Sequence, residues 1–149
     1  MIQRIQSLYL LAVAILSVIG LCSPIGSIIG ANHEISELTN LCIHLSDGAK
    51  DYAPWALFVI LLVVAILSFV TIFLFKRRML QIRLTIFSSV VLIGYYIVLG
   101  AFVFMLAEDT GFVPSWIICL PFVSLVLNWL AIRSIGADEA LVKAYDRLR

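Results

Sequence analysis

Charged residues are scarce in this chain, and their scarcity excludes a soluble protein. Of the 149 residues, 13% are charged and 63% are hydrophobic. A soluble domain has about a quarter charged residues and about half apolar ones. A domain of this size also leaves about a third of its unfolded surface exposed. Lipid must therefore cover part of the surface of so apolar a chain.

Four long apolar stretches contain no acidic, basic or histidine residue. Each approaches or exceeds the roughly 20 residues that a helix needs to cross a bilayer. Short segments of alternating hydrophobicity, the pattern of a transmembrane barrel, are missing. We therefore predict an all-α membrane protein, a single integral domain over residues 1–149 with four transmembrane helices. Their expected ranges are 5–24, 54–76, 80–106 and 113–134.

The first stretch also has the outline of a signal peptide, because Arg4 precedes a short apolar run. No small-x-small cleavage site directly follows the run, and Leu21 before Cys22 disfavours a lipoprotein site. A retained helix is therefore favoured over a cleaved signal. Pro24 can kink or end this helix.

Basic residues are nearly absent from one side of the predicted bundle. Residues 1–7, 76–83 and 133–149 hold nine of the ten Lys and Arg residues, and the other side holds Lys50 alone. Because Lys and Arg are retained on the cytoplasmic side, we predict a multi-pass protein of the cell inner membrane with both termini in the cytoplasm.

The only sizeable segment outside the predicted spans is the outer loop, residues 25–53. Its apolar patches flank a polar stretch, and Asp47-Gly48 is a turn signal. A short β-hairpin over the outer helix ends and an irregular loop both fit this pattern. The second outer loop, Ala107–Val113, reads as a tight acidic turn.

Motifs that carry chemistry are also missing. No phosphate-binding loop, zinc-protease helix, nucleophile elbow or C-x-x-C pair occurs. His33 and His44 match no metal framework, and the odd set Cys22, Cys42 and Cys119 favours free thiols, although one bridge is possible. We therefore expect no enzyme, no cofactor, no metal and no nucleic-acid partner.

The predicted cytoplasmic surface combines a basic loop with a C-terminal amphipathic helix over residues 136–149. The loop carries Lys76, Arg77, Arg78 and Arg83, which either attract anionic lipid or only set topology. Leu141, Tyr145 and Leu148 share one face of the tail helix. Their expected support is Met79 and Leu80, lipid or a partner. Three acidic residues are expected counterions of the loop: Asp138, Glu139 and Asp146.

Polar residues inside the spans lean toward the cytoplasmic half. Counting inward from the basic residues predicts one polar layer, formed by Tyr9, Thr71, Ser88 and Asn128. Asn128 belongs to a small-residue stripe with Ser124 and Ala131, which suits close helix packing. Hydrogen bonding between helices is favoured over a transport path, since such a path usually carries an ionisable group.

Three stretches together resemble a known family. They are residues 1–11, residues 75–84 and the ending Asp138-Glu-Ala-Leu-Val-Lys-Ala-Tyr-Asp-Arg-Leu-Arg. The chain resembles the Bacteroidota membrane family catalogued as domain of unknown function 4293. The resemblance implies a four-helix inner-membrane protein and brings no catalytic or ligand residues.

Two functions follow as hypotheses. The first is a non-enzymatic accessory or scaffold protein that contacts the bilayer and docks a protein partner through the basic loop and tail. The alternative is a small transporter or channel subunit that uses the polar layer. The sequence leaves the oligomeric state open.

Overall fold

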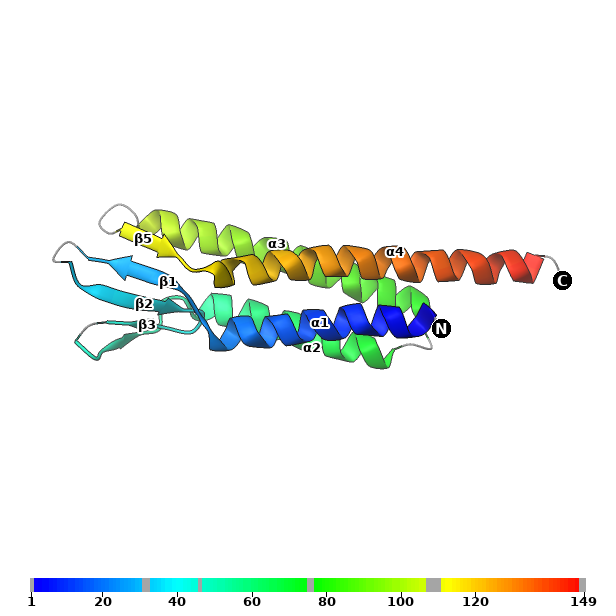
Figure 1. Ribbon diagram of the computed structural model, residues 1–149, viewed down its shortest axis with the longest axis horizontal. Coiled ribbons are helices and arrows are strands. Elements are labelled where there is room, and N and C mark those ends of the chain that lie inside the picture. Colours follow the sequence, from blue (N-terminus) through cyan, green and yellow to red (C-terminus); the bar gives the residue numbers. More distant parts are fainter. Residues whose placement is uncertain (1, 31–32, 46, 75–76, 107–110, 148–149) are drawn as a thin grey trace.

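The fold is a bundle of four long helices with a small sheet at one end. The computed structural model describes residues 2–30, 33–45, 47–74, 77–106 and 111–147. The helices are α1 (Ile2–Cys22), α2 (Trp55–Phe73), α3 (Arg78–Leu106) and α4 (Cys119–Arg147). All four contain a stretch long and apolar enough to cross a membrane. We call the end with the strands the sheet end, and the end with residues 77–83 and 133–147 the basic end (Figure 1).

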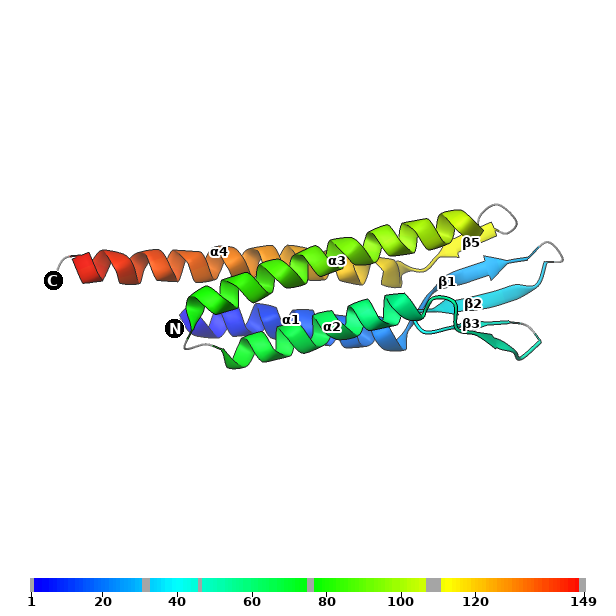
Figure 2. The same cartoon turned by 180° about the vertical axis from the view of Figure 1, so that it is seen from behind.

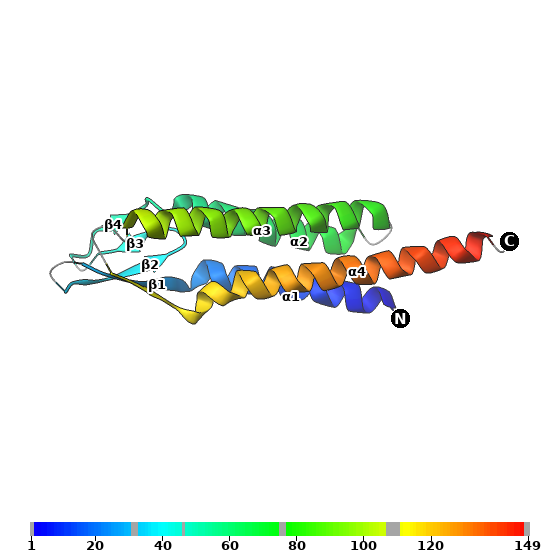
Figure 3. The same cartoon turned by 90° about the horizontal axis from the view of Figure 1, so that it is seen from above.

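The helices form a closed ring. α1 packs on α2 and α4, and α3 packs on the same two helices. Figure 2 shows α3 alongside α4 from behind, and Figure 3 shows two layers, α2 with α3 over α1 with α4. The short connection between α2 and α3 makes them antiparallel neighbours.

Each helix buries one residue in every three or four along a single stripe, which is the spacing of helices packed around a shared core. We call this core the seam. Apolar side chains such as Leu8, Ile97 and Phe104 face outward instead. A helix that is apolar on its outer face as well belongs in lipid. The seam positions are Gln6, Leu10, Val13, Ser17 and Gly20; Leu57, Leu61, Val64, Ser68 and Thr71; Gln81, Thr85, Ser88, Leu92, Tyr95 and Leu99; and Pro121, Ser124, Asn128, Ala131, Ile135 and Asp138.

The outer loop forms four strands instead of a single short hairpin, and a fifth strand from the segment before α4 joins them. Five antiparallel strands pair in the order β4-β3-β2-β1-β5. β1 pairs with β2 on one side and with β5 on the other. The strands are β1 (Pro24–Ile29), β2 (Ile35–Thr39), β3 (Ile43–His44), β4 (Lys50–Asp51) and β5 (Gly111–Pro114).

Strand β5 corrects two predictions about the segment before α4. Residues 111–113, expected in a tight turn, form β5 with Pro114, while residues 107–110 of that turn lie outside the described residues. The fourth helix, expected from residue 113, follows a 3-10 turn at Trp116–Ile118 and begins at Cys119. The free edge of β1 pairs with this segment. Just after it, the Ser115 N–H donates to the Ile25 carbonyl at 2.8 Å. Proline is tolerated on such an edge strand.

The other helix boundaries also differ from the predicted ones. α2 ends at Phe73, short of residue 76, and α3 begins at Arg78, before residue 80. The predicted tail helix is a continuation of the fourth helix, one of the two arrangements that the sequence allows, because α4 runs through Gly136 to Arg147. Its 29 residues span about 44 Å. The C-terminal part of α4 projects beyond the other helices at the basic end (Figure 1).

The sheet shares its core with the helices. Ile25, Ile28, Leu38 and Ile43 from the strands pack in one buried cluster with residues of α1, α2 and α3. Asn40, just after β2, donates from Nδ2 to the Gly20 carbonyl at 2.6 Å and accepts from the Tyr95 hydroxyl at 2.9 Å. Gly20 lies in the last turn of α1, where backbone carbonyls lack helical partners. Asn40 therefore joins the sheet to two helices.

Candidate functional site

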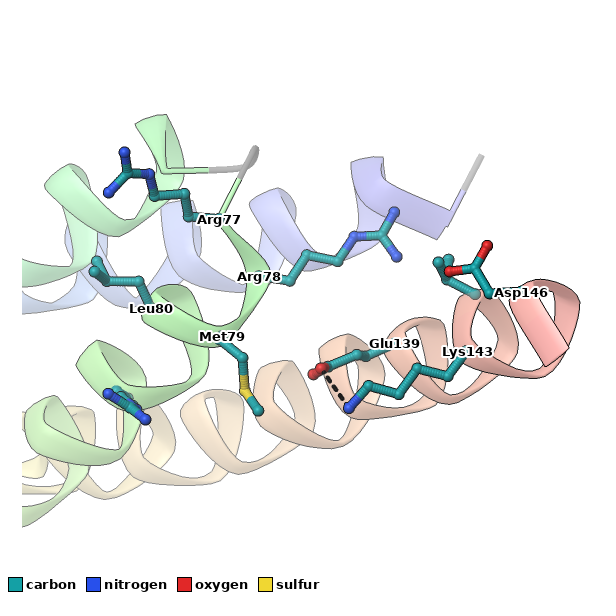
Figure 4. Close-up of a pocket in the computed structure, with 9 residues that line it drawn as sticks. Arg77, Arg78, Met79, Leu80, Glu139, Lys143 and Asp146 are labelled. Carbon is teal, nitrogen blue, oxygen red and sulfur yellow. Dashed lines mark ion pairs between the residues drawn. The ribbon is translucent and has the colours of Figure 1, made fainter.

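A groove lies at the basic end, where the first turns of α3 face the projecting part of α4. The groove has a volume of about 630 Å³. α3 contributes basic and apolar residues, and α4 contributes acidic, basic and apolar ones (Figure 4). The lining residues are Arg77, Arg78, Met79, Leu80, Arg83, Glu139, Val142, Lys143 and Asp146.

Of the charge pairs that the sequence suggests around the groove, the described residues form the i,i+4 pair of Glu139 with Lys143, and no salt bridge joins Glu139 to the basic loop. Among the described residues the salt bridge is Lys143 Nζ to Glu139 Oε1, at 3.0 Å within α4. Glu139 therefore pairs along its own helix rather than with the basic loop. In Figure 4, Met79 points toward Glu139 while Arg77 points away from α4. The arginines of α3 form no salt bridge within the described part of the chain, so their charges are available to another molecule.

Asp138 is the site residue that sequence reasoning misplaced. Its side chain is 7% exposed, and its Oδ2 accepts from Gln6 Nε2 at 2.6 Å. Arg78 Nη1 contacts the Asp138 backbone carbonyl at 3.5 Å. Asp138 thus joins α1, α3 and α4 at the inner side of the groove. Its spacing after Ala131 and Ile135 continues the seam, and that periodicity is the signal that could have located it.

Replacing Gln6 by leucine should lower the free energy of unfolding by about 2 kcal/mol, because a buried carboxylate then loses its hydrogen bond. Thermal or denaturant unfolding in detergent micelles measures this loss. Glu139→Gln is the control, since its exposed ion pair with Lys143 contributes about 1 kcal/mol or less. Equal losses in the two variants would contradict the assignment of Asp138 to the core.

The predicted contact residues are only partly brought together. Arg77, Arg78 and Arg83 line the groove, whereas Leu141 and Tyr145 are exposed and lie outside its lining. Val142 takes the place on α4 that the sequence suggested for Leu141. Lys76 and Leu148 lie outside the described residues.

The predicted polar layer is part of a larger polar region of the seam. Thr71, Ser88 and Asn128 are buried, and Tyr9 is partly exposed. Asn128 Nδ2 donates to Ser88 Oγ at 3.3 Å, joining α4 to α3. The Thr71 hydroxyl instead donates to the Leu67 carbonyl of its own helix.

Three buried oxygen atoms in this region have no hydrogen-bond partner among the described residues. They are Ser68 Oγ, Ser124 Oγ and Asn128 Oδ1. Leaving such a group without a partner costs about 1–3 kcal/mol, so each needs a physical explanation. Other hydroxyls of the seam are satisfied within their own helices, as in the bond from Ser17 to the Val13 carbonyl.

Cysteine and histidine residues form no metal site in the described part of the chain. No group of three or more His, Cys, Asp or Glu residues there could hold an ion. Cys22, Cys42 and Cys119 are free thiols, of which only Cys42 is buried. His33 and His44 lie in the strand region, and His44 Nε2 is 3.4 Å from Cys42 Sγ.

Comparison with known proteins identifies the family without indicating a function. No curated protein matches the sequence. A family model described as domain of unknown function (DUF4293) matches residues 2–148, nearly the whole chain. The chain, with its four candidate membrane helices and basic groove, therefore belongs to the family DUF4293.

Proposed function

We propose that this protein is a non-enzymatic accessory or scaffold protein of the inner membrane that docks a protein partner at its basic end. The observation that carries the proposal is the groove of about 630 Å³ between α3 and the projecting part of α4. Val142 follows Asp138 by one helical turn, so it extends the seam stripe of α4 beyond the bundle. Opposite it lie the charged and apolar residues of the first turns of α3.

The charge distribution supports a cytoplasmic location for this groove. Among the described residues, six Lys and Arg residues lie in the segments 77–83 and 133–147 at the basic end, and Lys50 belongs to β4 at the other end. Retention of positive charge in the cytoplasm then orients the four helices with both termini inside. A soluble partner would reach the groove without entering lipid.

The chemistry of the groove indicates the kind of partner segment. Met79, Leu80 and Val142 offer apolar surface, and all three are exposed. Arg78 and Arg83 border that surface without a salt bridge to any described residue. A partner segment with an apolar side chain flanked by carboxylates would complement both features, and charged hydrogen bonds would add specificity.

Val142→Asp should weaken capture of the partner at least about fivefold, since a carboxylate placed in an apolar contact costs more than about 1 kcal/mol. Quantitative affinity purification of the tagged full chain in mild detergent measures the effect. The matched control is Leu141→Asp, because Leu141 is the neighbouring residue, is similarly exposed and lies outside the groove lining. Identical co-purifying proteins in both variants would reject the groove as a docking surface.

A small transporter or channel subunit is the second candidate, and the buried polar region supports it. The apolar stretches of the predicted spans contain no ionisable group, which disfavours a transport path. The structure places the ionisable Asp138 on the same seam stripe as Asn128. Flux through the reconstituted protein is the measurement that separates this function from docking.

A further inference from the structure

The seam changes its chemistry along its length. Toward the sheet end it consists of large apolar residues, including Leu57, Leu61, Leu92 and Leu99. Farther toward the basic end it has buried polar residues on all four helices, with Gln6 and Ser17 on α1, beside apolar residues such as Ala131. Those on the other three helices are Ser68 and Thr71 on α2, Gln81, Thr85 and Ser88 on α3, and Ser124 and Asn128 on α4.

Contacts between the helices set the relative depths of these residues. Asn128 lies level with Ser88 because their side chains are hydrogen-bonded. A Cβ on Gly20 would lie 3.6 Å from Leu61, which places Leu61 near the outer end of α1. Ser68 follows Leu61 by two helical turns, so it lies about 10 Å closer to the basic end. Ser124 precedes Asn128 by one helical turn, so it lies about 6 Å closer to the sheet end, level with Leu92. The three partnerless oxygen atoms therefore lie at successive levels of the seam.

In the described part of the chain, the hydroxyls of Ser68 and Ser124 do not form the hydrogen bond to their own helix backbone that other seam hydroxyls form. A buried Ser or Thr in a helix can donate to the carbonyl four residues earlier, and Ser17, Thr71 and Thr85 do so. The Ser68 and Ser124 hydroxyls form no such bond among the described residues. A hydrogen-bonding molecule within the seam accounts for this choice, whereas helix contacts alone do not.

We propose that the seam binds water at Ser68, Ser124 and Asn128, with the apolar side chains of Leu57 and Leu99 beyond this water toward the sheet end. The three groups are neutral oxygens, which suit a small neutral ligand. Water donates to the Asn128 Oδ1 atom and exchanges donor and acceptor roles with both hydroxyls. This binding site does not depend on whether the protein docks a partner or transports a solute.

Silver-ion reactivity of introduced cysteines tests the proposal in the full chain. Cys22, Cys42 and Cys119 are first replaced by alanine, and single variants Ser68→Cys and Ser88→Cys are then made. Leu57→Cys and Leu99→Cys are the controls, because they lie on the same helices with similar burial but in the apolar length. After exposure to Ag⁺, the chain is denatured and the remaining thiol is counted by maleimide mass shift.

The thiols at positions 68 and 88 should react at least about 100-fold faster than those at 57 and 99, because the reactive thiolate forms in water and is suppressed in apolar surroundings. Equal rates at all four positions would overturn the proposal.

A second measurement needs no cysteine. Ser124→Ala should lower the midpoint of thermal unfolding, since it removes a hydroxyl bonded to water. A higher midpoint would show that the hydroxyl is buried without a partner, and it would also overturn the proposal.

Discussion

Asn40→Leu should lower the free energy of unfolding by about 3 kcal/mol, one of the largest losses that a single side chain of this protein can cause. The change leaves two buried groups without partners, the Gly20 carbonyl and the Tyr95 hydroxyl, at about 1–3 kcal/mol each. Leucine has the same number of side-chain heavy atoms as asparagine in the same branched arrangement, so no cavity opens and the effect mainly reports lost hydrogen bonds. Unfolding in mixed micelles measures it.

Tyr95→Phe provides the control for this result. In a chain that already carries Tyr95→Phe, the Asn40→Leu change leaves one orphaned group in place of two. Its cost should therefore fall by about 1 kcal/mol. The same cost in both backgrounds would show that the bond between Tyr95 and Asn40 does not stabilise the fold.

Gly26→Ala should detach β5 from the sheet and destabilise the protein by about 2 kcal/mol, the effect of overpacking a tight core. A Cβ at this position would lie 2.6 Å from the Val113 carbonyl oxygen and 2.8 Å from the Phe112 ring. The nearest atom belongs to the backbone, so relief requires β5 to move. Hydrogen exchange at the amides of residues 111–113 and the unfolding midpoint measure both consequences.

Gly111→Ala is the matched control for that change. It makes the same substitution on the paired strand, where the added Cβ would meet Ile29 at an ordinary 3.8 Å. Its stability should stay the same or rise slightly, because alanine restricts the unfolded chain. A similar loss in both variants would point to glycine flexibility rather than to the close approach of β5.

The helices could be predicted because their signal is local. Uncharged length alone located four spans, and helical periodicity located the stripe of Ser124, Asn128 and Ala131 that the structure buries. Strand β5 could not be found in this way. Its partner β1 lies more than half the chain away, and Pro114 also reads as a first helical residue.

The candidate site was predicted in part for a similar reason. The basic residues of α3 are conspicuous in sequence, and the groove includes them. Asp138 is expected from its charge to be a counterion of the basic loop, whereas the structure buries its side chain. Only the packing of three helices shows that Gln6 supplies its hydrogen bond, and such a contact depends on tertiary geometry rather than on spacing along the chain.

The pairing of the two ends of the chain determines how the protein can mature during its synthesis. α1 emerges first, yet its neighbour α4 and its hydrogen-bonding partner Asp138 are translated last. Until then β1 has an open edge and Gln6 lacks its acceptor. The first helix of a ribosome-bound nascent chain would therefore stay incompletely packed through most of translation. The ring closes only when α4 has been made and can pack on α1.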